Sequence, residues 1–467
     1  MAQSRLNLVN VIQNGEFYTL PTDECLQLIK EEYPIELEWL KTAYAVPGPT
    51  SDLPETPSPS MHLYGAEFDE VNRTLVSVLS LRWIYNKDYN SFIRNQIPHI
   101  KLTSGSFDWI STFFHNSLNN TSSDDVYSLI TSIIINDLGK SQSLITEYQR
   151  LASIDISRLN HDMILYQVVS KYPHLIPSLS RLPETHKADL IMGIKLGAEF
   201  SFGQLAQAEN VPASLLGIEA IKGHTHAFDL RFMEQLLDIA GAAGHVDHTC
   251  AKKLTEPVFQ SFKNVYDASI GIIEDRFGVD EAYSLNLTRR VELLINVGWE
   301  KGRELDVDEP IHRALMRLLC MTNSADVEAA DLIFDTFFKD LSDDTRFRLI
   351  IGLNSDGSLK QPAVQATYIP AVCSAAINST KVATKSEKEK ALAAVFRYLA
   401  RTLDIDVEEV QKRLPPGVLV IERDIRRTIM DIVNSKHFRE DPGILDCIDV
   451  PKDDVAKMAE GYEWVIQ

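Results

Sequence analysis

The stretch DDVYSLITSIIINDLGK, residues 124–140, decides the fold class of this chain. Its apolar side chains recur at three- and four-residue spacing, at Val126, Leu129, Ile130, Ile133 and Ile134. This spacing predicts a helix from Asp124 to Leu138 with one buried face. Asp137 lies four residues after Ile133 on the same face. We therefore expect its carboxylate to point toward the core, where it needs a compensating cation such as a metal ion.

The same helical period runs through most of the 467 residues, and 45% of them are apolar, enough for one large core or several smaller ones. The sequence predicts an all-α protein. Five prolines between Ala45 and Met61 indicate a linker. We expect an N-terminal arm and linker over 1–61, a helical domain over 62–300 that holds ten of the twelve histidines, and a C-terminal helical region over 301–467.

The composition bounds the class of partner. A net charge of -20, without a basic cluster, argues against binding to nucleic acid or to an anionic membrane surface. The basic residues of Glu422–Arg427 are interrupted by acids, which is typical of a solvated helix face. Five widely spaced cysteines and the absence of an export signal or long apolar run favour a cytoplasmic protein. The expected partner is a small molecule, and the oligomeric state is not indicated.

The pentapeptide Asn136-Asp-Leu-Gly-Lys140 resembles the His-Asp signature of the HD-domain superfamily, in which His-Asp-Ile/Leu-Gly-Lys ends a buried helix. Here Asn136, a far weaker metal ligand, stands in place of the histidine. The resemblance implies an HD-like helical bundle with metal ligands on several helices: a histidine, the His-Asp pair, further histidines and a final aspartate. In chain order the candidates are His115, Asp137, His161, His224 and Asp238.

A second short segment extends this resemblance. Asn160-His-Asp-Met-Ile-Leu-Tyr166 is similar to a Gly-His-Asp segment of the HD-fold diiron oxygenases, such as the myo-inositol oxygenases. In those enzymes the lysine after the motif contacts the substrate, so the resemblance implies a catalytic role for Lys140. From the residues alone, Asp137 could equally pair with a buried Arg or Lys, with Gly139 capping the helix. Likewise, His161 could be an ordinary core histidine.

Two further groups are candidates. Asp238 precedes the small residues of Gly241–Gly244, which permit a close helix approach, but Arg231 and Glu234 share its helix face and make its assignment less secure. Alternatives for the ligand positions are Asp229, Asp247, His186, His226 and His245. The second group is a short polar segment amid apolar neighbours, with Gln204, Gln207 and Glu209. Its side chains are suited to hydrogen bonding with a substrate, although a solvated helix face explains them equally well.

Three functions follow from these observations. The first is an HD-type oxygenase that uses one or two iron ions on a small polar substrate. The second is a phosphohydrolase that uses Mn or Mg at the same site. The third is a degenerate HD scaffold that binds a ligand or a partner without catalysis. The sequence contains no phosphate-binding loop, no His-Glu-x-x-His and no Gly-x-Ser-x-Gly motif.

Overall fold

The computed structural model describes residues 2–44, 56–119, 122–153, 156, 159–378, 384–451, 455–458 and 464–466. The predicted all-α class is confirmed, because helices dominate the described residues and the strands form one small sheet. Each described helix is too short or too polar to cross a membrane. Most of the proline-rich stretch predicted to be a linker lies outside the described residues.

The chain divides into two units: residues 1–198 with 223–260, and residues 199–222 with 261–467. This division differs from the predicted one. The expected N-terminal arm forms helices that belong to the first unit, and the expected domain over 62–300 is split between both units. Short apolar helices can join any nearby core, so their spacing along the sequence did not reveal which core they join.

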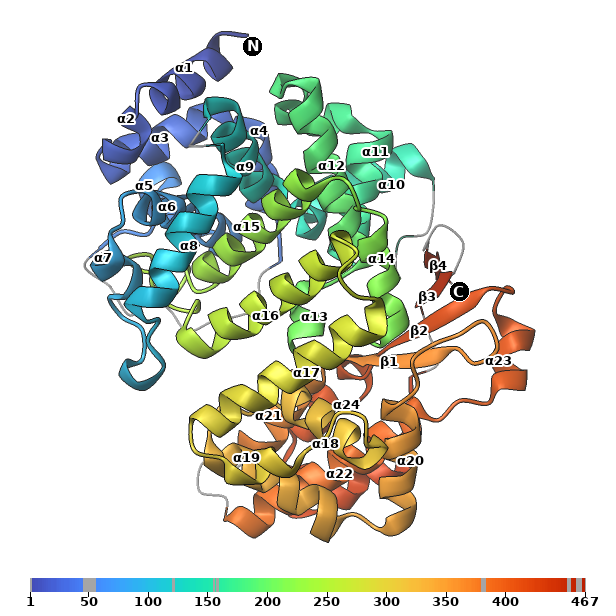
Figure 1. Ribbon diagram of the computed structural model, residues 1–467. Coiled ribbons are helices and arrows are strands. Elements are labelled where there is room, and N and C mark those ends of the chain that lie inside the picture. Colours follow the sequence, from blue (N-terminus) through green and yellow to red (C-terminus); the bar gives the residue numbers. More distant parts are fainter. Residues whose placement is uncertain are drawn as a thin grey trace. The chain divides into compact units, whose positions relative to one another are not determined.

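The first unit consists of helices throughout its described residues (Figure 1). They are α1 (Ala2–Gln13), α2 (Glu16–Thr19), α3 (Thr22–Glu32), α4 (Pro34–Leu40), α5 (Pro59–Tyr64), α6 (Asp69–Tyr85), α7 (Tyr89–Ile93), η1 (Pro98–Ile100), α8 (Ser104–Ser117), α9 (Ser123–Ile135), η2 (Leu138–Lys140), α10 (Gln142–Ala152), α11 (His161–Lys171), η3 (Pro173–Leu175), η4 (Pro177–Arg181), α12 (Glu184–Glu199, whose last residue belongs to the second unit) and α15 (Thr225–Gly241).

Two of these helices form the centre of the first unit. In α6, 13 of 17 residues are buried, and in α9, 11 of 13, so both are enclosed rather than amphipathic. Helices α5, α8, α9 and α15 all pack against α6. The helix predicted to end at Leu138 ends at Ile135 instead. The backbone of Asp137 leaves the helical conformation, with φ −95° and ψ 8°, and the short 3-10 helix η2 follows.

Glycines set the distance between elements at two places in this unit. A Cβ added to Gly139 in η2 would collide with the backbone carbonyl of His161, so η2 lies directly against the start of α11. A Cβ on Gly241 would collide with Ser77 and with the carbonyl of Arg73, so the end of α15 lies directly on α6. Gly139 is therefore a close-packing residue and not the helix cap considered from the sequence.

The second unit joins helices to a small mixed sheet (Figure 1). Its elements are α13 (Phe202–Ala206), η5 (Pro212–Leu215), α14 (Leu216–Glu219), α16 (Glu256–Ile273, whose first turn belongs to the first unit), α17 (Val279–Asn296), η6 (Glu300–Glu304), α18 (Pro310–Met321), α19 (Val327–Asp335), the π-helix η7 (Thr336–Asp340), α20 (Asp343–Leu353), β1 (Ala363–Thr367), α21 (Ile369–Asn378), α22 (Lys385–Leu403), α23 (Val407–Arg413), β2 (Val418–Asp424), α24 (Arg426–Val433), α25 (Lys436–Glu440), η8 (Pro442–Cys447), β3 (Val455–Met458) and β4 (Trp464–Ile466).

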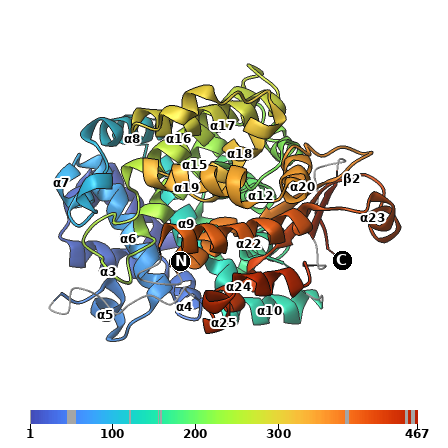
Figure 2. The same ribbon diagram turned by 90° about the horizontal axis from the view of Figure 1, so that it is seen from below.

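Helix α22 is the central element of the second unit. Figure 2 shows it as a long helix beside α19 and α20, both of which contact it. The capping box of Thr384 and Glu387 fixes its start, as the helix-prone segment from Thr384 predicts.

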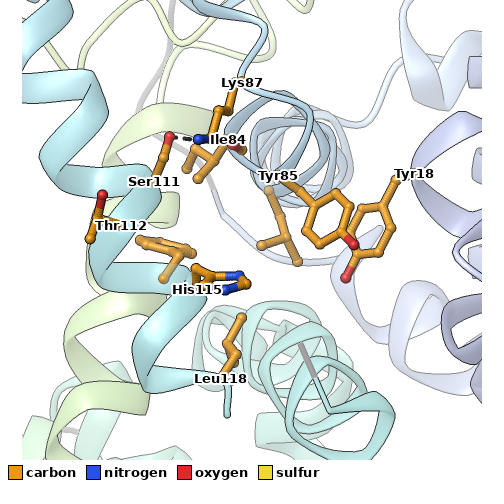
Figure 3. A pocket seen from close by; sticks show the side chains of 10 residues that line it. Tyr18, Ile84, Tyr85, Lys87, Ser111, Thr112, His115 and Leu118 are labelled. Atoms are coloured by element: carbon orange, nitrogen blue, oxygen red, sulfur yellow. Dashed lines mark hydrogen bonds between the residues drawn. The ribbon is translucent and has the colours of Figure 1, made fainter. Parts of the chain in front are cut away.

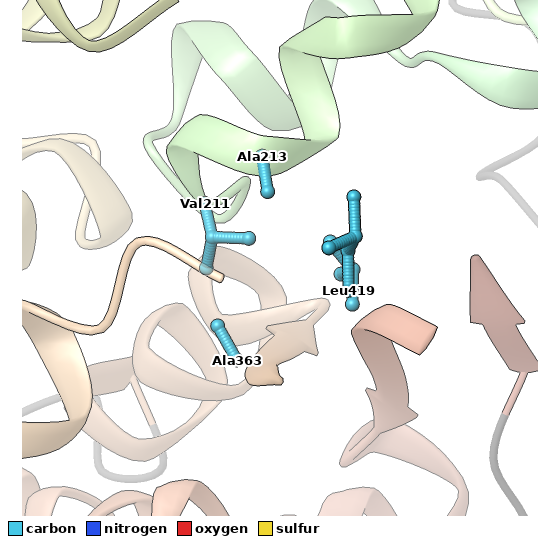
Figure 4. Close-up of a cluster of buried hydrophobic side chains, with 5 residues drawn as sticks. Val211, Ala213, Ala363 and Leu419 are labelled. Carbon is cyan, nitrogen blue, oxygen red and sulfur yellow. The ribbon is translucent and has the colours of Figure 1, made fainter. Parts of the chain in front are cut away.

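The sheet of the second unit has the order β1-β2-β3-β4, with β1 and β2 parallel and the other pairs antiparallel. Its first two strands pack on η5 through a cluster of buried side chains (Figure 4): Val211, Ala213, Ala363, Leu419 and Val420. The prediction of a solvated helix face over Glu422–Arg427 is wrong in its first half. Arg423 belongs to β2, is 6% exposed, and donates a hydrogen bond to the carbonyl of Thr402.

Candidate functional site

Asp137 lies in a cluster of buried charges in the first unit, where η2, α6, α9 and α15 meet. The ammonium nitrogen of Lys140 lies 2.8 Å from Oδ1 of Asp137 and 2.8 Å from Oε1 of Glu70. Glu70 sits in the first turn of α6 and its side chain is fully buried. Lys140 therefore bridges two carboxyl groups from different elements, and it provides the compensating cation that the buried position of Asp137 requires.

Arginines extend the cluster on both sides. Nη1 of Arg73, one turn after Glu70 on α6, donates to Oε2 of Glu70 at 3.0 Å. On α15, Arg231 donates from Nη1 to Oδ1 of Asn136 at 2.8 Å and also to the buried carboxyl of Glu234. A Cβ on Gly197 of α12 would collide with the Arg231 guanidinium. The arginine is thus held in place by packing as well as by hydrogen bonds.

His161 and Asp162 form the more open side of the cluster. His161 is the first residue of α11, and its side chain is 31% exposed rather than fully buried as the sequence pattern suggests. Its Nε2 lies 3.9 Å from Oδ1 of Asp137 and 3.5 Å from Oδ2 of Asp162. The other carboxylate oxygen of Asp162 lies 3.6 Å from Nη2 of Arg231. The contact of Gly139 with the His161 carbonyl explains why this histidine lies beside Asp137.

The electrostatics of the cluster separate its acids into two kinds. Burial, together with a hydrogen bond to Asp137, raises the pKa of Glu70 to about 8. Burial alone would raise the pKa of Asp137 as well, but Lys140, the hydrogen bond from Glu70 and His161 outweigh it and lower that pKa. The pKa values of these two carboxyl groups are therefore shifted apart, upward for Glu70 and downward for Asp137.

The α15 carboxyl groups behave like Glu70. Burial raises the pKa of Glu234 to about 8, even though Arg231 acts in the opposite direction. Desolvation and the charge of Asp137 raise the pKa of Asp238, while Lys140 and Arg73 act to lower it. Asp238 therefore belongs to the same electrostatic cluster as Asp137, as expected from the sequence order. Arg231 and Glu234, whose presence on the same helix face made the assignment of Asp238 less secure, are themselves buried, and Glu234 is only 1% exposed.

The remaining predicted ligands lie elsewhere in the first unit. His115 is on α8, where it lines a cavity with Tyr18 and Tyr85. His224 is exposed and immediately precedes α15. It is fourteen residues from Asp238, which corresponds to about 21 Å along a helix. The five predicted ligands thus do not form one site: Asp137, His161 and Asp238 share a cluster, whereas His224 is far beyond coordination distance from Asp238.

The predicted substrate-binding residues all lie in the second unit, where their contacts are structural. Oε1 of Glu209 accepts a hydrogen bond from the backbone nitrogen of Ile369 at 2.7 Å, and burial raises the pKa of Glu209 to about 8. Oε1 of Gln204 accepts from Nε2 of Gln365 on β1 at 2.9 Å. Gln207 ends the short helix α13. These side chains attach the segment before η5 to the sheet region.

Two of the alternative histidines form a separate cluster in the first unit. His186 of α12 and His226 of α15 approach the same oxygen of Asp125, with Nε2 to Oδ1 distances of 2.9 and 3.4 Å. Nδ1 of His226 lies 2.9 Å from Oδ2 of Asp189. The hydrogen bond with Asp125 raises the pKa of His226 to about 9, although burial opposes it. These contacts connect α9, α12 and α15.

The side chains of the charge cluster do not fit a metal ion in their present arrangement. Lys140 contacts one carboxyl oxygen of Glu70, and Arg73 contacts the other. Lys140 is also next to Asp137, so a metal ion bound by these carboxyl groups would be close to an ammonium group. Within the described ranges, no group of three or more His, Cys, Asp or Glu side chains is arranged to hold a metal. We therefore derive no catalytic step through a metal.

Glu70 and Arg73 are members of the site that were not predicted from the sequence, and Arg231 and Glu234 were expected only to share the polar helix face of Asp238. A signal was present for the first pair: Glu70 and Arg73 occur one turn apart at the start of a helix whose next eight residues, 74–81, are apolar or small, as expected of a buried ion pair. For Arg231 there was no such signal, because a polar helix face has the same pattern whether it meets solvent or another polar face.

Comparison with known proteins gives one match. No curated protein and no solved structure matches the chain. The model of a family of unknown function, DUF6829, matches residues 26–445, which include every residue of the charge cluster and most of both units. The chain therefore belongs to the DUF6829 family.

Proposed function

We propose that the first unit is an HD-like helical scaffold in which Lys140 takes the place of a metal ion, and that it binds a ligand or partner without metal-dependent catalysis. The observation that carries this proposal is the bridging position of Lys140, 2.8 Å from a carboxyl oxygen of both Glu70 and Asp137. An ammonium group in this position supplies positive charge, but it offers no exchangeable coordination site to a substrate.

Three further contacts support a fixed, ligand-independent cluster. Asn136 stands where the HD signature has a histidine, and its side-chain oxygen accepts a hydrogen bond from Arg231. Arg73 contacts the remaining oxygen of Glu70. Nη2 of Arg231 also lies 3.6 Å from a carboxyl oxygen of Asp162. A hydrogen-bonded cluster of cations and carboxyl groups of this kind favours a structural role that fixes the helices.

A metal-dependent oxygenase or phosphohydrolase is the second candidate. It is favoured by one observation: Asp137, His161 and Asp238, which the HD resemblance assigns to the metal, belong to the same cluster. This candidate requires Lys140 to leave its position between Glu70 and Asp137. Substrate, metal and reaction class would then follow the resemblance.

Metal analysis separates the two candidates. The purified full-length chain is dialysed against Fe(II), Mn(II) or Mg(II) and then against buffer, and bound metal is measured by mass spectrometry, with Asp137→Asn as the matched variant. We expect far less than one ion per chain in both proteins. One ion or more per chain in the wild type, lost in Asp137→Asn, would overturn the scaffold proposal and support the second candidate.

A further inference from the structure

A cavity in the first unit lies between α2, α6 and α8 and has a volume of about 370 Å³ (Figure 3). This volume is within the range typical of small-molecule sites. Apolar side chains of α6 and α8, including Leu81, Ile84 and Phe114, form much of its lining. None of the residues of the charge cluster lines it, so it is a different site from the one described above.

Tyr18, which lines the cavity, carries a polar group without a partner in the described part of the chain. Tyr18 is 3% exposed, and its ring stacks on that of Tyr85 with centroids 3.3 Å apart. The Tyr18 hydroxyl is buried and has no hydrogen-bond partner among the described residues. Leaving such a hydroxyl unsatisfied is unfavourable, so a molecule in the cavity that offers an oxygen acceptor would gain from contact with it.

The charged side chains of the cavity lining are basic. Lys87 and His115 line it, and the lining contains no acidic residue, although acids outnumber Lys and Arg by 66 to 46 in the whole chain. The Lys87 side chain extends to the neighbourhood of Ser111 (Figure 3). Lys87 and His115 are both exposed, so an anionic group placed between them would remain partly hydrated.

The backbone at Lys87 adds an independent argument. Its φ is +53°, in the left-handed region that follows the end of α6. Glycine adopts this conformation without strain and is the usual residue after a helix, whereas a lysine is disfavoured. A strained residue that bears the positive charge of a cavity indicates that the side chain has a role at this position.

From this lining we infer that the cavity binds a small, flat organic acid, with its carboxylate at Lys87 and His115, its apolar body against Leu81 and Ile84, and a hydroxyl or carbonyl oxygen that accepts from Tyr18. This site goes beyond the proposed scaffold function and does not depend on it. Binding of such an acid and the absence of metal are separate measurements, so either proposal can fail alone.

Three fluorescent naphthalenes test the site on the full-length protein: 6-hydroxy-2-naphthoate, 2-naphthoate without the hydroxyl, and 2-naphthol without the carboxylate. We expect the first to bind most tightly. Tyr18→Phe should weaken 6-hydroxy-2-naphthoate about fivefold and leave 2-naphthoate unchanged, because one neutral hydrogen bond is lost. Lys87→Gln should weaken both carboxylates about tenfold and leave 2-naphthol unchanged.

The control variant is Lys171→Gln, an exposed lysine of α11 outside the cavity lining. It should bind all three probes as the wild type does. Tyr18→Phe removes a hydroxyl without a partner and keeps the ring, so the fold should persist, which a thermal melt verifies. Binding that is absent at millimolar probe, or equal for 2-naphthol and 6-hydroxy-2-naphthoate, or unaffected by both cavity variants, would overturn the inference.

Discussion

Lys140 and Glu70 lie 70 residues apart in the chain, yet the ammonium nitrogen of the first is 2.8 Å from a carboxyl oxygen of the second. The same nitrogen contacts Asp137, three residues earlier. The lysine thus joins η2 to the first turn of α6. Most of the properties of the charge cluster that can be tested depend on this double contact.

Replacing Lys140 by methionine should destabilise the protein strongly. Methionine keeps most of the side-chain volume but removes the ammonium partner of Asp137 and leaves Glu70 with Arg73 alone, and breaking a buried ion pair on one side costs about 3–5 kcal/mol. Urea denaturation measures the free energy of unfolding. Lys171→Met, on an exposed lysine, is the control and should change it by less than about 0.5 kcal/mol.

A second variant distinguishes the loss of the ion pair from a general failure to fold. Adding Asp137→Asn to Lys140→Met removes the carboxylate that has lost its lysine, so it should restore part of the lost stability. If Lys140→Met unfolds at the urea concentration of the wild type, the lysine is not the cation that balances this site.

Asn136→His recreates the HD signature, but we expect it to gain no metal. The asparagine oxygen accepts a hydrogen bond from Arg231, and an imidazole in its place meets a buried guanidinium while Lys140 still occupies the position beside Asp137. The variant should lose about 1–3 kcal/mol of stability, because Arg231 loses an acceptor. Calorimetric titration with Fe(II) and Mn(II) provides the measurement, and stoichiometric binding by the variant would contradict the structural account.

Gly139→Ala should destabilise the contact between η2 and α11. Its new methyl group would collide with the backbone carbonyl of His161, and backbone cannot move aside as a flexible side chain can. Overpacking of this kind costs about 1–3 kcal/mol. Gly105→Ala is the matched control: nothing lies near the added methyl group, so it should be neutral or stabilise α8 by up to about 1 kcal/mol. Equal effects of the two variants would argue against close packing at Gly139.

Stability should fall as the pH rises from about 5 to about 8. Burial raises the pKa of Glu209 from its ordinary value of 4.5 to about 8, so between these values the folded chain binds a proton that the unfolded chain has lost. The stabilisation from the protonated carboxyl is complete below pH 4.5 and is lost as the pH rises through 8. Glu70 and Glu234 act in the same direction.

Glu209→Gln isolates one of these contributions. Glutamine does not titrate, so the variant should lose less stability between pH 5 and 8.5 than the wild type, by on the order of a few kcal/mol. The exposed Glu408 supplies the control, since Glu408→Gln should keep the wild-type pH profile. Urea denaturation at a series of pH values is the measurement, and identical profiles for all three proteins would contradict the assignment.

The fold class could be predicted from the sequence because helical spacing is a local property. The spacing of apolar residues predicts helices over Glu309–Met321 and Asp344–Leu353, and the structure has α18 over Pro310–Met321 and α20 over Asp343–Leu353. The sheet was missed because β3 and β4 are only four and three residues long, and because the apolar run at Val418–Ile421 is too short to separate a strand from a helix by its period.

The candidate site could be predicted in one respect. The position of Asp137 required a nearby cation, and that reasoning did not depend on the rest of the fold. The cation is Lys140, three residues away, whereas Glu70, Arg73 and Arg231 could not be predicted as members of the site, because they come from helices whose neighbours are decided only in three dimensions. His224 and Asp238 were grouped because of the order of residues in a family motif. In the structure, His224 immediately precedes α15, and Asp238 lies near the other end of the same helix.

Helix α6 contributes to both places where chemistry gathers in the first unit. Glu70 is its second residue and Tyr85 its last, a separation of about 22 Å along the axis. Because an α-helix resists stretching, this one buried helix holds the charge cluster and the cavity at a fixed distance from each other.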